Sequence, residues 1–121
     1  MYRISIRYHF DAAHFLRSYP GKCSQLHGHR WVAEVVVKGE VLDDLGMLVD
    51  FSLIKTQLKQ ALAEVDHRLI NEHAYFQTVN PTAENLARFV FGQLRELPAG
   101  VRVERVRVYE TPDAWAEFGE V

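Results

Sequence analysis

The residues most able to do chemistry gather in one short stretch, Cys23-Ser24-Gln25-Leu26-His27-Gly28-His29. Imidazole is a favoured zinc ligand, and side chains two apart on a strand point to the same face, so His27 and His29 can reach one ion. A catalytic zinc site takes three protein ligands and leaves a fourth position open. We expect His14 to supply the third nitrogen, because antiparallel pairing after a first strand would bring it beside His27.

Cys23 has three interpretations on the residues alone. Beside a cation its thiolate form could act as a base, as a fourth zinc ligand it would close the site, and as a buried thiol it would be inert. A lone cysteine excludes only an internal disulfide.

Two further places carry titratable side chains. Asp66-His67 follows a predicted helix, where a polar pair in a loop is the simplest interpretation and a proton-transfer pair is the alternative. Glu110 ends a predicted strand on the same face as valines, where a carboxylate is costly unless something binds it. The simplest partner would be Arg105 or Arg107 in a surface salt bridge.

Period-two alternation predicts the strands that must position these residues. It runs from Ile4 to Phe10 and again from His27 to Val37. The third strand, from Val101 to Glu110, changes phase between Val103 and Val106, which predicts a bulge or a late strand start near Glu104. Residues 115–119 can supply a short fourth strand.

Two amphipathic helices are predicted between the second and third strands. Asp50 is a plausible N-cap for the first, whose apolar stripe runs from Phe51 to Val65. Thr82 can cap the second, whose stripe runs to Leu97 before Pro98 closes it. Asn71 lies between them and is read as a turn residue. The order predicts an α+β fold with an antiparallel four-stranded sheet covered by helices on one face.

The composition fits one soluble globular domain spanning residues 1–121, with 48% apolar and 25% charged residues. We find no apolar run long enough to cross a bilayer and no apolar core of a signal peptide, so we expect a cytoplasmic protein. The formal net charge of −2 argues against nonspecific nucleic-acid binding but leaves room for a small anionic substrate.

Six motifs in order make the chain similar to the 6-pyruvoyltetrahydropterin synthase and 6-carboxytetrahydropterin synthase family. They cover nearly the whole chain: Phe10-Asp11-Ala12-Ala13-His14, Cys23-x-x-x-His27-Gly28-His29, Gly46-Met47-Leu48-Val49-Asp50-Phe51, Asp66-His67-Arg68-Leu69-Ile70-Asn71, Pro81-Thr82-Ala83-Glu84-Asn85 and Glu110-Thr111. The resemblance implies the tunnelling fold, whose subunits join edge to edge into barrels and stack as homohexamers with active sites between subunits.

The resemblance also implies roles for single residues. His14, His27 and His29 match the zinc ligands, and Cys23, Asp66 and His67 match the proton-transfer residues. Glu110 matches the residue that anchors the pterin ring, and Thr82 matches a further ring contact, although its helix cap suffices to explain it. Asp113 departs from the Ser or Thr that many relatives carry at the rim of the pocket.

The implied activity is zinc-dependent conversion of 7,8-dihydroneopterin triphosphate to 6-carboxy-5,6,7,8-tetrahydropterin, acetaldehyde and triphosphate, in queuosine biosynthesis. The short spacing from Cys23 to His27 favours this branch, because the pyruvoyl-forming synthases typically carry a longer insertion there. The pyruvoyl-forming synthase, which does not cleave the side chain, is the first alternative. A non-catalytic zinc-stabilised interaction module, with Cys23 as fourth ligand, is the second.

Overall fold

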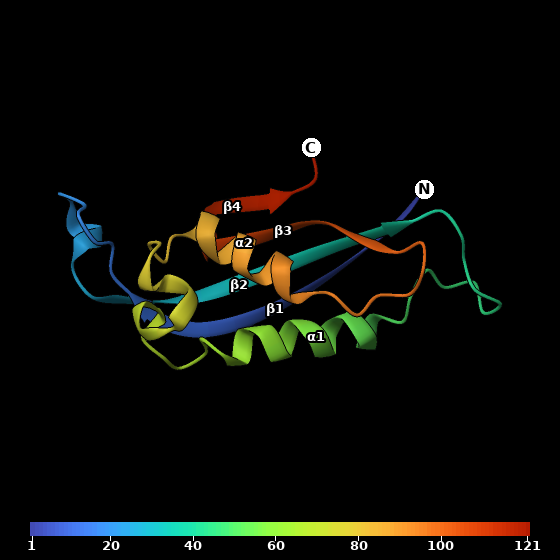
Figure 1. Cartoon of the computed structure of the whole chain (residues 1–121), viewed down its shortest axis with the longest axis horizontal. Coiled ribbons are helices and arrows are strands. Elements are labelled where there is room, and N and C mark those ends of the chain that lie inside the picture. The colour runs from blue at the N-terminus through green and yellow to red at the C-terminus, as the bar shows by residue number, and fades with distance from the viewer.

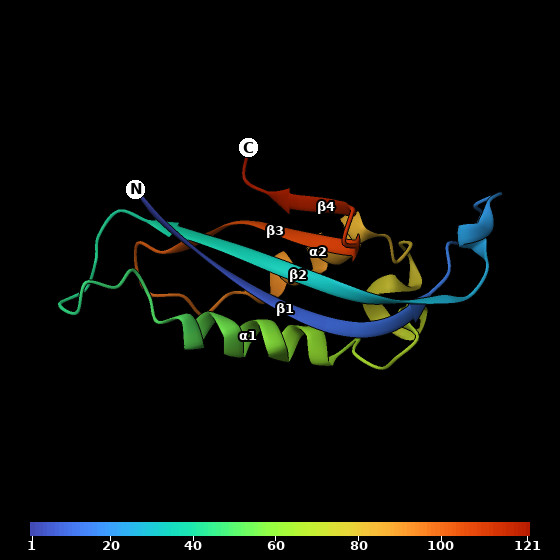
Figure 2. The ribbon, with the colours of Figure 1, turned by 180° about the vertical axis from the view of Figure 1, so that it is seen from behind.

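The computed structural model describes residues 1–121 and contains one antiparallel sheet with two helices. Its main elements are β1 (Tyr2–His14), β2 (His27–Gly39), α1 (Phe51–Ala63), α2 (Ala83–Gln93), β3 (Arg102–Thr111) and β4 (Ala114–Gly119). The strands are ordered β1-β2-β3-β4, and the helices lie on one face of the sheet (Figures 1 and 2). The predicted α+β architecture with two helices between strands 2 and 3 is confirmed.

The long β1–β2 pair sets the frame of the molecule. Each strand has 13 residues, and their register places His14 directly opposite His27. Alternate residues of both strands face the helices, so Phe10 and Trp31 are almost fully buried and stack with ring centroids 5.8 Å apart. The alternation in the sequence therefore gives both the core face and the pairing that we expected for His14.

A bulge in β3 resolves the change of phase in its apolar pattern. Val36 pairs with Arg105 while Val37 pairs with Val103, so Glu104 is the extra residue on the bulged strand. The bulge lets Val103, Val106 and Val108 all face the core, and it confirms the predicted irregularity near Glu104.

Side-chain caps begin both helices where the sequence predicts. The Asp50 carboxylate accepts a hydrogen bond from the Ser52 N–H at 2.8 Å, and the Thr82 hydroxyl accepts one from the Asn85 N–H at 3.1 Å. No helix of the protein is long and apolar enough to cross a membrane.

The ends of the helices differ from the predicted stripes. α2 ends at Gln93, four residues before Leu97, because Leu94 leaves helical geometry at φ −92° and ψ 78°. Leu94 is nevertheless buried, and Leu97 still packs against the core from the irregular chain that follows. Phe51, the first residue of the predicted stripe of α1, is 58% exposed. Apolar spacing predicts which residues are buried better than it predicts where a helix ends.

Candidate metal centre and the residues around it

Three imidazoles meet at the end of the β1–β2 pair. His14 and His27 lie opposite each other with ring centroids 4.5 Å apart, and His29, two residues further along β2, lies 4.8 Å from His27 and 5.4 Å from His14. The indole of Trp31 packs edge-on against the rings of His14 and His29. Strand pairing thus brings together the three histidines that the sequence predicts as metal ligands.

Backbone carbonyls fix which nitrogen of two of these rings faces the cluster. The Nδ1 of His14 lies 2.7 Å from the Pro81 carbonyl oxygen, and the Nδ1 of His27 lies 2.7 Å from the Gln25 carbonyl oxygen. A carbonyl only accepts, so each Nδ1 carries the proton and donates it. The Nε2 lone pairs of His14 and His27 are therefore left for a ligand, as is usual for metal-binding histidines.

Glu110 completes a group of four ligand atoms. Its Oε1 lies 3.1 Å from the Nε2 of His14 and 3.2 Å from the Nε2 of His29. The ligand atoms of the three histidines and Glu110 all lie within 4.8 Å of one another. Atoms that share one zinc at about 2.1 Å lie at most about 4.2 Å apart, so small side-chain movements would suffice to hold an ion.

Two buried nitrogens of this group have no hydrogen-bond partner. The Nε2 atoms of His14 and His29 are buried and make no hydrogen bond. For His14 this nitrogen presents a lone pair to a carboxylate oxygen, so two acceptors face each other 3.1 Å apart. A bound metal ion would satisfy both at once, and the residues present therefore fit a metal site.

Burial keeps two of the imidazoles in the form that binds metals. Desolvation, followed by repulsion from His27, lowers the pKa of His29, although the nearby Glu110 carboxylate opposes the shift. The pKa of His14 is also lowered, chiefly by desolvation and against the hydrogen bond to Pro81. Both rings are therefore neutral near neutral pH, and neutral imidazole is the metal-binding form.

Cys23 lies beside this group without belonging to it. The thiol is on the short turn η1 (Lys22–Ser24) and is half-buried. It lines a cavity of about 540 Å³ together with His27, His29 and Glu110, but its sulfur is outside the four-ligand group. A hydrogen bond of 2.7 Å from the Leu16 N–H to the Cys23 carbonyl holds the turn near the end of β1.

The Asp66-His67 pair lies at the outer edge of β1. The Nδ1 of His67 is 2.9 Å from Asp66 Oδ1, and that same oxygen accepts a hydrogen bond from the Asp11 N–H at 2.9 Å. His67 adopts the left-handed region at φ 58°, and its N–H donates to the Asp11 carbonyl. These contacts fix the backbone beside the pair and hold the His67 ring against the Asp66 carboxylate.

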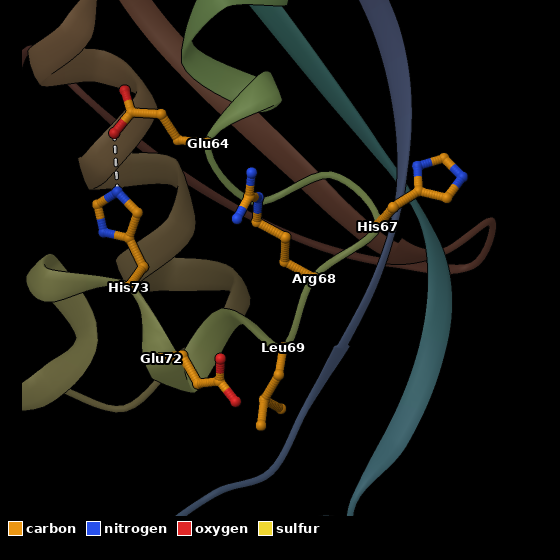
Figure 3. A pocket seen from close by; sticks show the side chains of 6 residues that line it. All are labelled: Glu64, His67, Arg68, Leu69, Glu72 and His73. Atoms are coloured by element: carbon orange, nitrogen blue, oxygen red, sulfur yellow. Dashed lines mark hydrogen bonds and ion pairs between the residues drawn. The ribbon is translucent and has the colours of Figure 1, made fainter.

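One chain does not bring His67 to Cys23. The His67 side chain is 77% exposed and lines cavities of about 460 and 500 Å³, neither of which includes the thiol. Figure 3 shows its ring turned away from the ion pair of Glu64 with His73. Within a single copy, the predicted proton-transfer residues therefore fall into two separate places.

Thr82 and Glu110 are the other two predicted site residues, and only Glu110 lines the cavity of Cys23. Thr82 caps α2 next to Pro81, whose carbonyl orients His14, but Thr82 does not line the cavity of Cys23. The simple interpretation of Glu110 as a surface salt bridge is wrong, because Arg107 pairs with Glu117 and Arg105 lies near Glu34 and Glu117.

Sequence reasoning missed two amides that hold the loop before Cys23. Asn71 is buried rather than an ordinary turn residue, and its side chain bonds both the N–H and the carbonyl of Phe15, at 3.0 and 2.9 Å. Asn80 does the same for Arg17 at 2.9 and 3.1 Å. Asparagine is common in turns, so its residue type alone gave no signal of this contact across the fold.

Comparisons with known proteins identify the family of the chain. The model of the family described as 6-pyruvoyl tetrahydropterin synthase matches residues 3–121. A protein of Archaeoglobus fulgidus, provisionally named 6-carboxy-5,6,7,8-tetrahydropterin synthase, is 41% identical over 95% of this chain and 93% of its own length. The 6-carboxy-5,6,7,8-tetrahydropterin synthase of Rickettsia felis is 34% identical over 97% of this chain and 99% of its own.

A solved structure confirms the fold. The 6-pyruvoyl tetrahydropterin synthase of Caenorhabditis elegans superposes with a TM-score of 0.88 at 29% identity, covering 99% of this chain and 96% of the other. The predicted tunnelling fold is therefore correct.

Proposed function

The chain belongs to the 6-pyruvoyl tetrahydropterin synthase family, and we propose that it is a zinc-dependent 6-carboxy-5,6,7,8-tetrahydropterin synthase. The relatives with this name support a reaction of pterin biosynthesis. Our proposed substrate is 7,8-dihydroneopterin triphosphate, and the products are 6-carboxytetrahydropterin, acetaldehyde and triphosphate. The observation that carries the proposal is the convergence of three imidazoles beside a cavity that also holds Cys23 and Glu110.

His14, His27 and His29 would hold the zinc ion through nitrogen. When bound there, zinc would act as a Lewis acid that makes the side-chain hydroxyls and adjacent C–H bonds of the substrate more acidic. The carbonyls of Pro81 and Gln25 keep two of these rings in the binding tautomer.

Glu110 would anchor the pterin ring. A pterin presents a ring N–H and an exocyclic amino group side by side, so one carboxylate can accept two parallel hydrogen bonds. Glu110 lines the cavity and its side chain is 31% exposed, so it is accessible to a ligand. In this proposal its carboxylate turns from the imidazoles to the ring when the substrate binds. Thr82 is a second predicted ring contact.

Cys23 and His67 would move protons during the reaction. Cys23 faces the same cavity as the metal ligands, so it can take a proton from the substrate side chain. His67 is oriented by Asp66, which can stabilise the protonated ring.

A complete site would need more than one copy of the chain. Since His67 and Cys23 line different cavities, we propose that His67 of one subunit meets Cys23 of another in a homohexamer. Each subunit would be one domain of residues 1–121. A cytoplasmic location and a place in queuosine biosynthesis stay predictions.

Product analysis tests the proposed reaction. The zinc-loaded protein is incubated with 7,8-dihydroneopterin triphosphate, and the pterin product is identified by its mass. We expect 6-carboxytetrahydropterin. A pyruvoyl product would favour the first alternative, which the likeness to the Caenorhabditis elegans enzyme supports.

The second alternative, a non-catalytic zinc-stabilised interaction module, predicts a different effect of replacing Cys23. A closed site of three histidines and a thiolate would lose affinity for zinc in Cys23→Ala. If the three histidines alone hold zinc, Cys23→Ala should keep stoichiometric zinc while losing most turnover. Metal analysis and steady-state kinetics of this variant distinguish the enzyme from the module.

A further inference from the structure

A second cavity lies on the face of the sheet that the helices leave uncovered. It has a volume of about 340 Å³ and is lined by Arg7, Arg30, Val32, Tyr109, Thr111 and Pro112. This lining contains two guanidinium groups and two hydroxyls but no carboxylate. Its size falls in the range that small-molecule ligands occupy.

Both arginine side chains keep unpaired N–H donors. The guanidinium of Arg30 makes no hydrogen bond, and its nearest acid is Asp11, with Nε 3.5 Å from Oδ1. Arg7 uses Nε for Glu34 at 2.7 Å and Nη2 for the Tyr109 hydroxyl at 3.2 Å. These contacts hold Arg7 in place while leaving its other N–H groups free, and the Tyr109 hydroxyl still has its own proton to donate.

This cavity shares one lining residue with each of the two cavities of the proposed active site. Thr111 lines it and also lines the cavity of Cys23, His27, His29 and Glu110. Arg30 lines it and also lines the cavity that contains His29 and His67. The metal ligands are on the helix-covered face of the sheet, as Trp31 is, so a ligand that reaches both the metal centre and the two arginines would pass around the end of β3 at Thr111.

We propose that Arg7 and Arg30, with the hydroxyls of Tyr109 and Thr111, form a binding site for phosphate groups. Guanidinium groups recognise phosphate oxygens through paired, charge-assisted hydrogen bonds, and hydroxyl donors add to them. The site rests on the proposed function for its ligand, the triphosphate of the pterin substrate or the triphosphate that the reaction releases.

Titration of the zinc-loaded protein with inorganic triphosphate tests the site. We expect Arg30→Gln and Arg7→Gln to weaken binding by at least about tenfold each, because each removes a charged donor pair. Arg3→Gln is the matched control, since Arg3 is on the same strand as Arg7 and its Nε also pairs with a glutamate, at 2.6 Å from Glu104. Zinc content and circular dichroism of each variant are measured alongside.

Two results would overturn the proposal. One is the same triphosphate affinity in the parent protein, Arg30→Gln, Arg7→Gln and Arg3→Gln; the other is no measurable binding by the parent protein. Because the Arg30 guanidinium makes no hydrogen bond and only one exposed ion pair, Arg30→Gln should fold normally even if Arg7→Gln does not. The titration does not depend on turnover, so failure of the proposed reaction would leave this result interpretable.

The kinetics of the same variants identify the source of the phosphate. If the site holds the substrate's own tail, Arg30→Gln should raise the KM for the pterin triphosphate without changing the affinity for a pterin that lacks phosphate. If it holds only released triphosphate, KM should be unchanged while inhibition by added triphosphate weakens. Either pattern supports a phosphate site.

Discussion

At the scale of single residues, two backbone carbonyls set the tautomers of two histidines in the cluster. Pro81 and Gln25 accept the Nδ1 protons of His14 and His27 and so direct their Nε2 lone pairs toward one point. Burial favours neutral His14 and His29. The cluster is therefore arranged to receive a cation before any cation binds.

Removing one imidazole should remove the metal. In His27→Ala we expect zinc content to fall well below one ion per chain and turnover to be abolished, because two histidines form a much weaker site. His9→Ala is the control, since His9 is exposed on the same sheet and outside the cluster. Metal analysis and steady-state assays provide the measurement, and a fully active, zinc-replete His27→Ala protein would refute the metal assignment.

The carboxylate of Glu110 should matter for the ring rather than for the ion. Glu110→Gln replaces one acceptor with an amide donor that would face a substrate N–H, so we expect pterin binding to weaken on the order of a hundredfold, about 3 kcal/mol. Titration with a pterin that lacks the side chain isolates this contact. Zinc content should be unchanged, because in the proposed site the three imidazoles hold the ion without this carboxylate, and an unaltered affinity would remove Glu110 from the ring site.

At the scale of elements, asparagine side chains tie the loop of Cys23 to the rest of the fold. Asn71 and Asn80 bond the backbone of Phe15 and Arg17, and the Leu16 N–H bonds the Cys23 carbonyl. The loop therefore receives its position from the segment between α1 and α2.

Loss of the Asn71 amide should loosen this loop. Asn71→Ala leaves the N–H and carbonyl of Phe15 without partners in a site where Asn71 is 5% exposed, so we expect the free energy of unfolding to fall by about 2 kcal/mol. Turnover should fall while zinc stays bound. The neighbouring exposed residue provides the control variant, Glu72→Ala. Chemical denaturation monitors the effect, and equal stability of the two variants would show that the contact is dispensable.

The sequence predicted those features that depend on local periodicity. Alternation along β1 and β2 implied that His14 would face His27, and the phase change in β3 implied the bulge at Glu104. It could not predict the end of α2 at Gln93, because Leu94 and Leu97 contact the core without being helical. The contact of Asn71 with Phe15 was equally hidden, since it joins positions 56 residues apart.

At the scale of the whole molecule, Cys23 and His67 are separated within one chain, although the proposed reaction uses both. Both residues lie near the same end of the β1–β2 pair, yet they line different cavities. No pattern within one chain can predict how a second copy is placed against it. The proposed active site between copies would bring the two residues together.

Mixed oligomers test this arrangement. Cys23→Ala and His67→Ala are each expected to be inactive, but co-expressed in one oligomer they should regain activity. If each site combines Cys23 of one subunit with His67 of another, random mixing leaves about a quarter of the sites intact. Differently tagged chains allow the mixed species to be isolated, and mixed oligomers as inactive as either parent would argue for sites within one chain.

The most direct test of the proposed activity is the ratio of two released products. The zinc-loaded protein is given 7,8-dihydroneopterin triphosphate, and acetaldehyde and triphosphate are quantified in the same time course. We predict that they appear in equal amounts, because the proposed reaction both eliminates triphosphate and cleaves the side chain. Release of triphosphate without acetaldehyde, or of neither product, would contradict the account.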